Sequence, residues 1–315
     1  MDTPRPFNAG ARPVNPSQAS RTALATSLMR ALHSRGDPAP LLDDPWGDRL
    51  VPQTVQAAFR ERARARVDPA LHDHALDIAL RANAGYAEVV LRSRYTEDAL
   101  QAAVARGVGQ YVIVGAGFDS FVCRRPAWAE GLTVYEVDHP ATQQLKRQCL
   151  KACGVAESAS VHFIEADLSV ESLGAALARS PFDPTRPAFF SWLGVTVYLP
   201  REANLAALRD IAACTSSTDS ELVFTYIDQA MLDDRREDAS NEAFRRLREE
   251  VSDAGEAFMS GFDPANLGEL LLGTGLQLLE DLDGHKAVAR YDPKGLNGLR
   301  PAGASHIAHA RVVRG

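Results

Sequence analysis

Long apolar runs, paired cysteines and an excess of positive charge are all missing from this 315-residue sequence. No apolar run approaches the roughly 20 residues that a membrane-spanning helix needs, so we expect no membrane contact. The first residues, Met-Asp-Thr-Pro-Arg-Pro, contain no apolar stretch of the kind that a secretory signal requires, which predicts a cytoplasmic protein. The four cysteines form no Cys-x-x-Cys pair, so we expect reduced thiols. The net charge of -7 argues against broad binding to nucleic acid.

Two catalytic patterns are also missing. No Gly-x-Ser-x-Gly motif occurs, so a serine hydrolase has little support. His72 and His74 stand two positions apart in a segment expected to be helical, where their side chains diverge, and we predict no metal site. The remaining composition, 45% hydrophobic and 24% charged residues, is typical of a globular enzyme with one large α/β domain or two domains.

The chain is organised around residues 111–120, Tyr-Val-Ile-Val-Gly-Ala-Gly-Phe-Asp-Ser. The run Tyr111 to Val114, cut off by glycine, predicts a buried parallel strand. Gly115 and Gly117 allow a tight turn that brings bare backbone close to a ligand. Asp119 or Ser120 can then cap the helix that follows. A strand, a glycine turn and a helix start predict the first unit of a nucleotide-binding sheet.

Strands and helices alternate after this motif. We expect further strands at 132–137, 161–164, 188–193, 221–227, 276–281 and 305–313. No helical pattern separates the last two strands, which predicts a late antiparallel strand.

About a hundred residues of helix precede the first strand, and the charged segment after the fifth strand is long for a simple crossover. Within the first part, a basic helix from Val55 to Arg66 is either a solvated surface or a lid that collects anions, and another helix begins at about Thr96. The expected organisation is a mobile leader at 1–18, an N-terminal helical cap at 19–107, and an α/β domain at 108–315 with a cap insertion at about 228–260.

The acids at the strand ends indicate which nucleotide is bound. A dinucleotide fingerprint has a third glycine where this chain has Ser120. Asp138 ends the second strand, where an acid can take both ribose hydroxyls. Asp167 ends the third strand and is followed by Leu168, where an adenine would lie. With the helical cap and the late antiparallel strand, this layout predicts an α/β fold of the class I methyltransferase type, a Rossmann-like seven-stranded sheet.

Short motifs then point to one family. In order along nearly the whole chain they are Ser20–Ala23, Leu42–Trp46, Val90–Tyr95, Gly115–Ser120, Tyr135–Pro140 with Lys146, Ala166–Leu168, Gly194–Pro200 and Arg290–Tyr291. In these motifs the sequence resembles the leucine carboxyl methyltransferase-like family of S-adenosylmethionine-dependent O-methyltransferases. It is most similar to the bacterial branch that includes polyketide carboxyl O-methyltransferases.

This resemblance implies S-adenosylmethionine as the cofactor and assigns roles by motif. Arg92 would hold the methionine carboxylate of the cofactor. The other expected cofactor-binding residues are Gly115, Ala116, Gly117, Asp119, Glu136, Asp138, Asp167, Leu168 and Leu193. Many members of the family carry a glutamate where this chain has Leu193, so that contact is lost or a cap residue supplies it. We expect Lys146 to be a surface lysine of its helix.

The acceptor decides what else the site must contain. A carboxylate is already ionised at neutral pH and needs no base, whereas a phenol with a pKa of about 10 needs one. We expect a small-molecule carboxylate, with a cation or hydrogen-bond donors in its pocket. A phenol or hydroxyl acceptor, the C-terminal carboxylate of a protein, cofactor binding without turnover and, remotely, an NAD-dependent oxidoreductase remain alternatives.

Candidate pocket residues follow the fourth and fifth strands, where open α/β sheets bind ligands. They are Trp192, Thr196, Tyr198 and Tyr226, with Asp228 beside them. For each, a packing or capping role explains the residue at least as well. Arg94 is either a clamp for the substrate carboxylate or part of a surface ion pair.

Overall fold

The computed structural model describes residues 20–232, 239–253, 256–301 and 303–314. The predicted leader at 1–18 and parts of the predicted insertion at 228–260 therefore lie outside the described residues. Within the described part of the chain, no helix is both long and apolar enough to cross a membrane.

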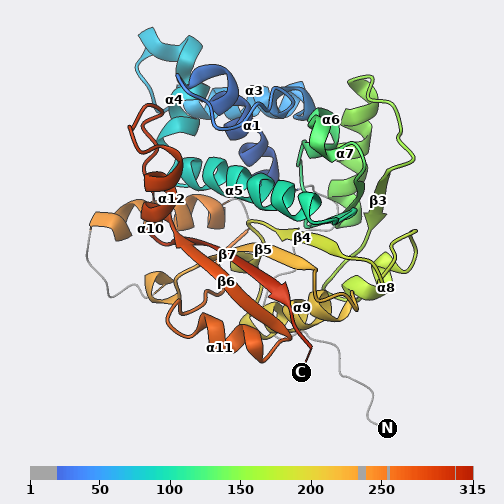
Figure 1. Ribbon diagram of the computed structural model, residues 1–315. Coiled ribbons are helices and arrows are strands. Elements are labelled where there is room, and N and C mark those ends of the chain that lie inside the picture. Colours follow the sequence, from blue (N-terminus) through green and yellow to red (C-terminus); the bar gives the residue numbers. More distant parts are fainter. Residues whose placement is uncertain (1–19, 233–238, 254–255, 302, 315) are drawn as a thin grey trace.

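A single seven-stranded sheet in the order β3-β2-β1-β4-β5-β7-β6 forms the centre of the protein (Figure 1). β7 runs antiparallel to both of its neighbours, which confirms the predicted late antiparallel strand. The other strands pair in parallel. The strands are β1 (Gln110–Val114), β2 (Thr133–Asp138), β3 (Val161–Glu165), β4 (Ala188–Trp192), β5 (Glu221–Ile227), β6 (Leu276–Asp283) and β7 (Ser305–Val312).

The strand order reverses between β1 and β4, and this reversal positions the site. All residues of β1 and β4 are buried, as expected for parallel strands covered on both faces. Ligands of such sheets bind outside the carboxyl ends of the strands at the point of reversal. Gly115 follows β1 there, and Gly194 lies two residues beyond the end of β4.

Helices cover both faces of the sheet. Before β1 the chain forms α1 (Arg21–Gly36), α2 (Gly47–Leu50), α3 (Gln53–Arg64), η1 (Pro69–His74), α4 (Ala75–Ala82) and α5 (Tyr86–Ala105). Between the strands lie α6 (Phe121–Arg124), η2 (Ala127–Ala129), α7 (Pro140–Ala152), α8 (Leu173–Leu177), η3 (Thr196–Tyr198), α9 (Arg201–Ala213), η4 (Gln229–Leu232), α10 (Ala239–Asp253), α11 (Leu267–Leu272) and α12 (Gly284–Tyr291).

Two expected boundaries are wrong. No new helix begins at Thr96, because α5 runs unbroken through that position and buries Val90, Leu91 and Tyr95. A helix does separate the last two strands: α12 begins after Asp283, whose side chain accepts a hydrogen bond from the Lys286 N–H at 2.9 Å.

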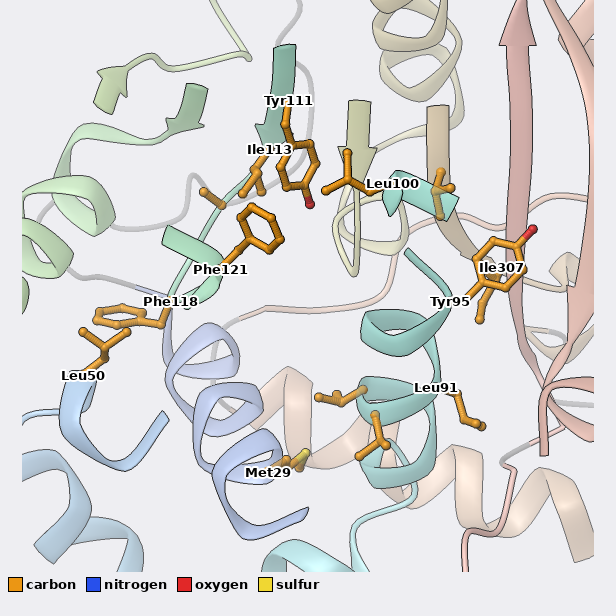
Figure 2. Packing of buried hydrophobic residues seen from close by; sticks show 14 of the residues in the cluster. Met29, Leu50, Leu91, Tyr95, Leu100, Tyr111, Ile113, Phe118, Phe121 and Ile307 are labelled. Atoms are coloured by element: carbon orange, nitrogen blue, oxygen red, sulfur yellow. The ribbon is translucent and has the colours of Figure 1, made fainter. Parts of the chain in front are cut away.

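One hydrophobic core joins the N-terminal helices to the sheet. Figure 2 shows Met29 of α1, Leu91 and Leu100 of α5, and Tyr111 and Ile113 of β1 in the same cluster. A second cluster covers the opposite face of the sheet beneath α8, α9 and α11. The N-terminal helices are therefore packed directly on the sheet, and the division of the chain at residue 107 stays a prediction.

Candidate cofactor and substrate site

The glycine turn after β1 has a backbone conformation that lets neighbouring groups come close to its main chain. Gly115 and Gly117 have φ values of 66° and 52°, in the left-handed region that glycine adopts at little cost. A Cβ on Gly115 would lie 2.6 Å from Cγ2 of Val195, so only glycine fits. The Gly115 and Ala116 N–H groups both donate to the Val137 carbonyl, which ties the turn to β2. The structure thus has the turn that the sequence predicts.

The helix after this turn is short, and its first N–H is satisfied by Asp119. The Asp119 carboxylate accepts from the Phe121 N–H at 2.8 Å, as expected for a capping acid. Ser120, the other capping candidate, makes no capping bond. Its hydroxyl donates instead to the buried Asp44 carboxylate at 2.6 Å.

Asp138 stands beside the turn at the end of β2. Its carboxylate accepts hydrogen bonds from the backbone N–H groups of Gly117 and His139. Burial raises the pKa of Asp138, while these two N–H groups act against that rise. The two backbone bonds leave further lone pairs on the carboxylate, so it can still accept from ribose hydroxyls.

Two residues earlier in β2, Glu136 pairs with Lys146 of α7, and its predicted contact with the cofactor stays a prediction. Its carboxylate lies 2.5 Å from Nζ of Lys146, and neither side chain has any exposed surface. Burial raises the pKa of Glu136 to about 7, although the Lys146 charge opposes that rise. The expectation that Lys146 is a surface residue is therefore wrong, because α7 lays this position against β2.

Arg92 lies beside the end of β4. A Cβ on Gly194 would be 2.7 Å from Nη1 of Arg92, so this glycine also makes room for a functional side chain. Arg92 donates to Glu88 at 3.2 Å, and Glu88 accepts from the Ser305 hydroxyl at 2.8 Å. Leu193 packs against the core. A carboxylate from α5, Glu88, thus stands near the place where many family members have a glutamate.

Beyond β3, apolar side chains are unusually exposed. Leu168 is 39% exposed and Val170 81% exposed. Asp167 accepts from the backbone N–H and the hydroxyl of Ser169 at 3.0 and 2.6 Å. An apolar surface beside a fixed acid suits the face and edge of an adenine ring.

Three of the four pocket candidates are core residues. Trp192 is 1% exposed and packs with Phe224. The Thr196 hydroxyl donates to the Thr225 carbonyl at 2.7 Å. The Tyr226 hydroxyl donates to Asp281 at 2.8 Å. Their side chains are thus engaged within the fold, and Asp228 likewise accepts from the Ala230 N–H at 2.9 Å.

Tyr198 is the remaining pocket candidate, and it lies where both parts of the predicted cap meet. Its ring packs edge-on against Phe258 at 5.6 Å. Burial raises the pKa of its phenol, and the nearby Glu256 carboxylate adds to that rise, whereas a hydrogen bond with Thr22 and the charge of Arg92 act against it.

Glu256 joins the start of α1 to the segment after α10. Its carboxylate accepts from the Arg21 N–H at 3.0 Å and from the Ser20 hydroxyl at 3.3 Å. Sequence reasoning missed Glu256, Glu88 and Thr22 as members of the site. The Ser20–Ala23 motif was the available signal for Thr22, but no local pattern distinguishes the two glutamates from other helix-surface acids.

Arg94 and the basic helix α3 lie outside this site. Arg94 pairs with Asp98 at 2.8 Å, and both side chains are more than one-third exposed, so the structure has the surface ion pair. Arg60 and Arg64 of α3 line a cleft of about 900 Å³ within the N-terminal helices, together with His72. None of the expected cofactor-binding residues lines that cleft. Among the residues that the structure describes, no group of three His, Cys, Asp or Glu side chains could hold a metal ion.

Comparisons with known proteins identify the family and the fold. A "Putative S-adenosyl-L-methionine-dependent methyltransferase" from Mycolicibacterium vanbaalenii is 34% identical over 251 residues, covering 78% of this chain and 79% of that protein. A protein of Bacillus subtilis with the same description, YktD, is 29% identical over 280 residues, covering 84% and 89%. The solved structure of a "putative methyltransferase" from Thermobifida fusca superposes with a TM-score of 0.55 at 14% identity, covering 95% and 96%, which shows a shared fold.

Fold and relatives together define an S-adenosylmethionine-dependent methyltransferase of class I. Residues 23–212 match the leucine carboxyl methyltransferase family, and the chain belongs to that family.

Proposed function

We propose that this enzyme methylates an oxygen of a small molecule, most directly a carboxylate of polyketide type, and does so in the cytoplasm. The proposal rests on the acceptor end of the site around Tyr198. Thr22 and the Arg92 guanidinium both act on the Tyr198 phenol, so a hydroxyl and a cation are available beside it for a carboxylate acceptor.

The residues of this site fit the cofactor. Gly115 and Gly194 follow the adjacent strands β1 and β4, and the missing Cβ atoms let Val195 and Arg92 lie close to the backbone there. Asp138 is positioned to accept ribose hydroxyls, Leu168 offers an apolar face to adenine, and Arg92 offers a guanidinium to the methionine carboxylate. The bound cofactor supplies a methyl group on a sulfonium, which already is a good leaving group.

The chain's own contribution is alignment and exclusion of water. The start of α1, held by Glu256, closes one side of the site, and the Tyr198–Phe258 pair closes another. The Tyr198 phenol is protonated at neutral pH, as a tyrosine ordinarily is, and burial raises its pKa further, so its hydroxyl can donate a hydrogen bond to the acceptor. A donor of this kind orients one oxygen of a carboxylate, and the other oxygen is then free to attack the methyl carbon in line.

A phenolic acceptor fits this arrangement less well. Deprotonating a phenol needs a base within hydrogen-bond reach of the acceptor. Glu256 is the carboxylate with the largest effect on the Tyr198 phenol, and it already accepts hydrogen bonds from Ser20 and Arg21. Glu256 is therefore engaged within the fold.

The experiment that tests the proposal compares matched acceptors. The enzyme is incubated with S-adenosylmethionine and with pairs of aromatic and aliphatic acids and the alcohols or phenols of the same skeleton. Mass spectrometry then detects products that have gained CH₂. We expect gains on the acids, and mild alkali should reverse them because esters hydrolyse. Alkali-stable ethers formed on the phenols, with no ester, would contradict the carboxylate assignment.

A further inference from the structure

The glycine turn that would cradle the cofactor is held in place by the N-terminal helices through one buried carboxylate. We propose that Asp44, with Arg30 and Ser120, positions this turn and so sets the affinity for the cofactor. The inference rests on the proposed cofactor contacts of the turn and assigns a positioning role to residues outside every expected contact.

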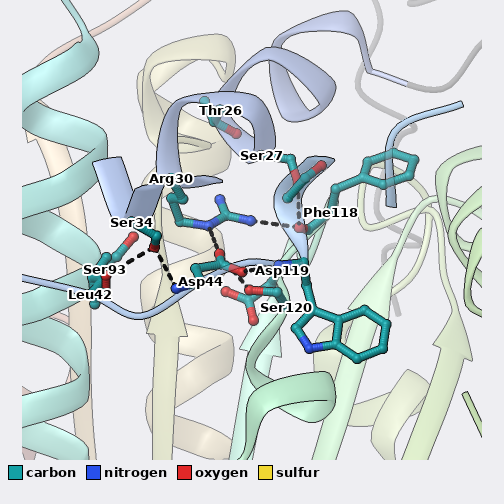
Figure 3. Close-up of polar contacts among 12 residues, drawn as sticks. Thr26, Ser27, Arg30, Ser34, Leu42, Asp44, Ser93, Phe118, Asp119 and Ser120 are labelled. Atoms are coloured by element: carbon teal, nitrogen blue, oxygen red, sulfur yellow. Dashed lines mark hydrogen bonds and ion pairs between the residues drawn. The ribbon is translucent and has the colours of Figure 1, made fainter. Parts of the chain in front are cut away.

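Asp44 lies in the loop between α1 and α2 and is fully buried. One of its oxygens accepts from Nε of Arg30 at 2.8 Å and from the Ser120 hydroxyl at 2.6 Å. Its other oxygen accepts from the Trp46 N–H at 3.2 Å. Figure 3 shows this carboxylate between α1 and the residues that follow the glycine turn.

Arg30 also holds the start of the segment Phe118–Ser120, which follows the glycine turn. Nη2 of Arg30 donates to the Phe118 carbonyl at 2.6 Å, and the Ser27 hydroxyl donates to that carbonyl at 3.3 Å (Figure 3). The carbonyl of Phe118 and the hydroxyl of Ser120 are thus both fixed from α1 and its following loop. Asp119, between them, is a predicted cofactor contact.

Burial makes these contacts strong and hard to replace. Arg30 is 7% exposed, and Ser27, Asp44 and Ser120 are all fully buried. The charges of Arg30 and Arg124 hold the pKa of Asp44 below its usual value in spite of the burial, so the carboxylate remains charged. A charged hydrogen-bond network that water cannot reach has few alternative arrangements.

The glycine turn depends on this hydrogen-bond network of Asp44, Arg30 and Ser120. Without the network, Gly115 and Gly117 would gain conformational freedom, and ordering them again when the cofactor binds would lower the affinity. The Gly117 N–H is bonded to Asp138, so any shift of Phe118 to Ser120 also moves the proposed ribose contact. Removing hydrogen bonds from the network of Asp44, Arg30 and Ser120 should therefore weaken cofactor binding and leave acceptor binding nearly unchanged.

The test measures the dissociation constant of S-adenosylhomocysteine by isothermal titration for Ser120→Ala, Asp44→Asn and the double variant. Ser120→Ala leaves the Arg30–Asp44 pair intact, and it still tests the idea if Asp44→Asn fails to fold. Ser93→Ala is the matched control, since it also removes a hydroxyl bonded within the protein, here to the Val89 carbonyl at 2.8 Å.

We expect Ser120→Ala to raise this dissociation constant about tenfold, with the acceptor KM within about twofold of wild type and no change for Ser93→Ala. The double variant should be little weaker than Asp44→Asn alone, because Ser120 acts through Asp44. A lower melting temperature for Ser120→Ala with a wild-type dissociation constant would overturn this inference and leave the proposed function standing. If the wild-type enzyme does not bind S-adenosylhomocysteine, the cofactor contacts fail as well.

Discussion

Replacing Asp138 by asparagine separates cofactor binding from folding. The substitution keeps the size of the side chain but removes the charge that the ribose hydroxyls would use. A hydrogen bond to a charged group contributes about 1.5–3 kcal/mol, and an amide oxygen replaces part of it. We therefore expect binding of S-adenosylhomocysteine to weaken by about 1–3 kcal/mol, or roughly 5- to 150-fold in dissociation constant.

The stability of the ligand-free protein should change much less on Asp138→Asn. Burial already raises the pKa of Asp138, so removing its charge relieves a desolvation cost. The new amide group, however, faces one of the two backbone N–H donors, of Gly117 or His139, and this opposes the gain. The melting temperature without ligand should thus stay near that of the wild type, while the shift that the ligand induces should shrink.

Isothermal titration and thermal unfolding, run together, check this prediction. Asp183→Asn is the matched control, since the Asp183 carboxylate also accepts from a backbone N–H, that of Thr185 at 2.9 Å, in an exposed turn before β4. A wild-type dissociation constant for Asp138→Asn would refute the placement of the ribose. An equal loss of affinity in Asp183→Asn would show that the effect is not specific to the site.

Four further predictions concern the buried Glu136–Lys146 pair and other parts of the site. Lys146→Met should lower the free energy of unfolding in urea by about 3–5 kcal/mol, because it leaves the buried Glu136 carboxylate unpaired. The double variant, Lys146→Met with Glu136→Gln, should recover most of that loss because it also removes the carboxylate. Burial raises the pKa of Glu136 to about 7, so its contribution to stability is greatest below about pH 4.5 and is lost as the pH rises through 7. Urea unfolding midpoints measured across this pH range should show the loss for the wild type. The double variant should not show it. Gly194→Ala should strain a residue at φ 68° and displace Arg92, so S-adenosylhomocysteine should bind at least about tenfold more weakly, and unaltered titration curves would contradict this. Tyr198→Phe should lower kcat about tenfold or more with little change in cofactor affinity, and wild-type kcat would remove Tyr198 from the mechanism.

The sheet was largely predictable because its signals are local. β5 has the predicted bounds, 221–227, since a mostly apolar run between a polar segment and a charged segment admits few alternatives. The glycine turn and Asp138 were recognisable for a similar reason, because the turn chemistry and the acid are adjacent to their strands. The late antiparallel strand is confirmed, although it was predicted from the lack of a helical pattern before it and α12 does lie there.

The helices were less predictable, since tertiary contacts decide their course. The sequence predicted a new helix at about Thr96. α5 continues through this position because Val89, Val90 and Leu91 before it and Leu100 after it are buried in the same core. α12 was missed because Gly284 and the following glycines and prolines resemble a loop, and its N-cap at Asp283 is the only start signal.

The long-range polar pairs were invisible in the sequence. Lys146 and Glu136 are ten positions apart, in a helix and a strand, and no periodicity links them. Asp44 lies in the Leu42–Trp46 motif, and nothing in that motif shows that its carboxylate reaches Ser120 across the fold. Such contacts depend on how the elements pack, which local patterns do not encode.

The most direct test of the central claim is a crystal structure of the enzyme with S-adenosylhomocysteine. We expect ribose hydroxyls within hydrogen-bond distance of the Asp138 carboxylate, adenine against Leu168 and the amino-acid carboxylate on Arg92. Electron density for the ligand in the cleft of the N-terminal helices beside Arg60, or a ribose that avoids Asp138, would contradict it.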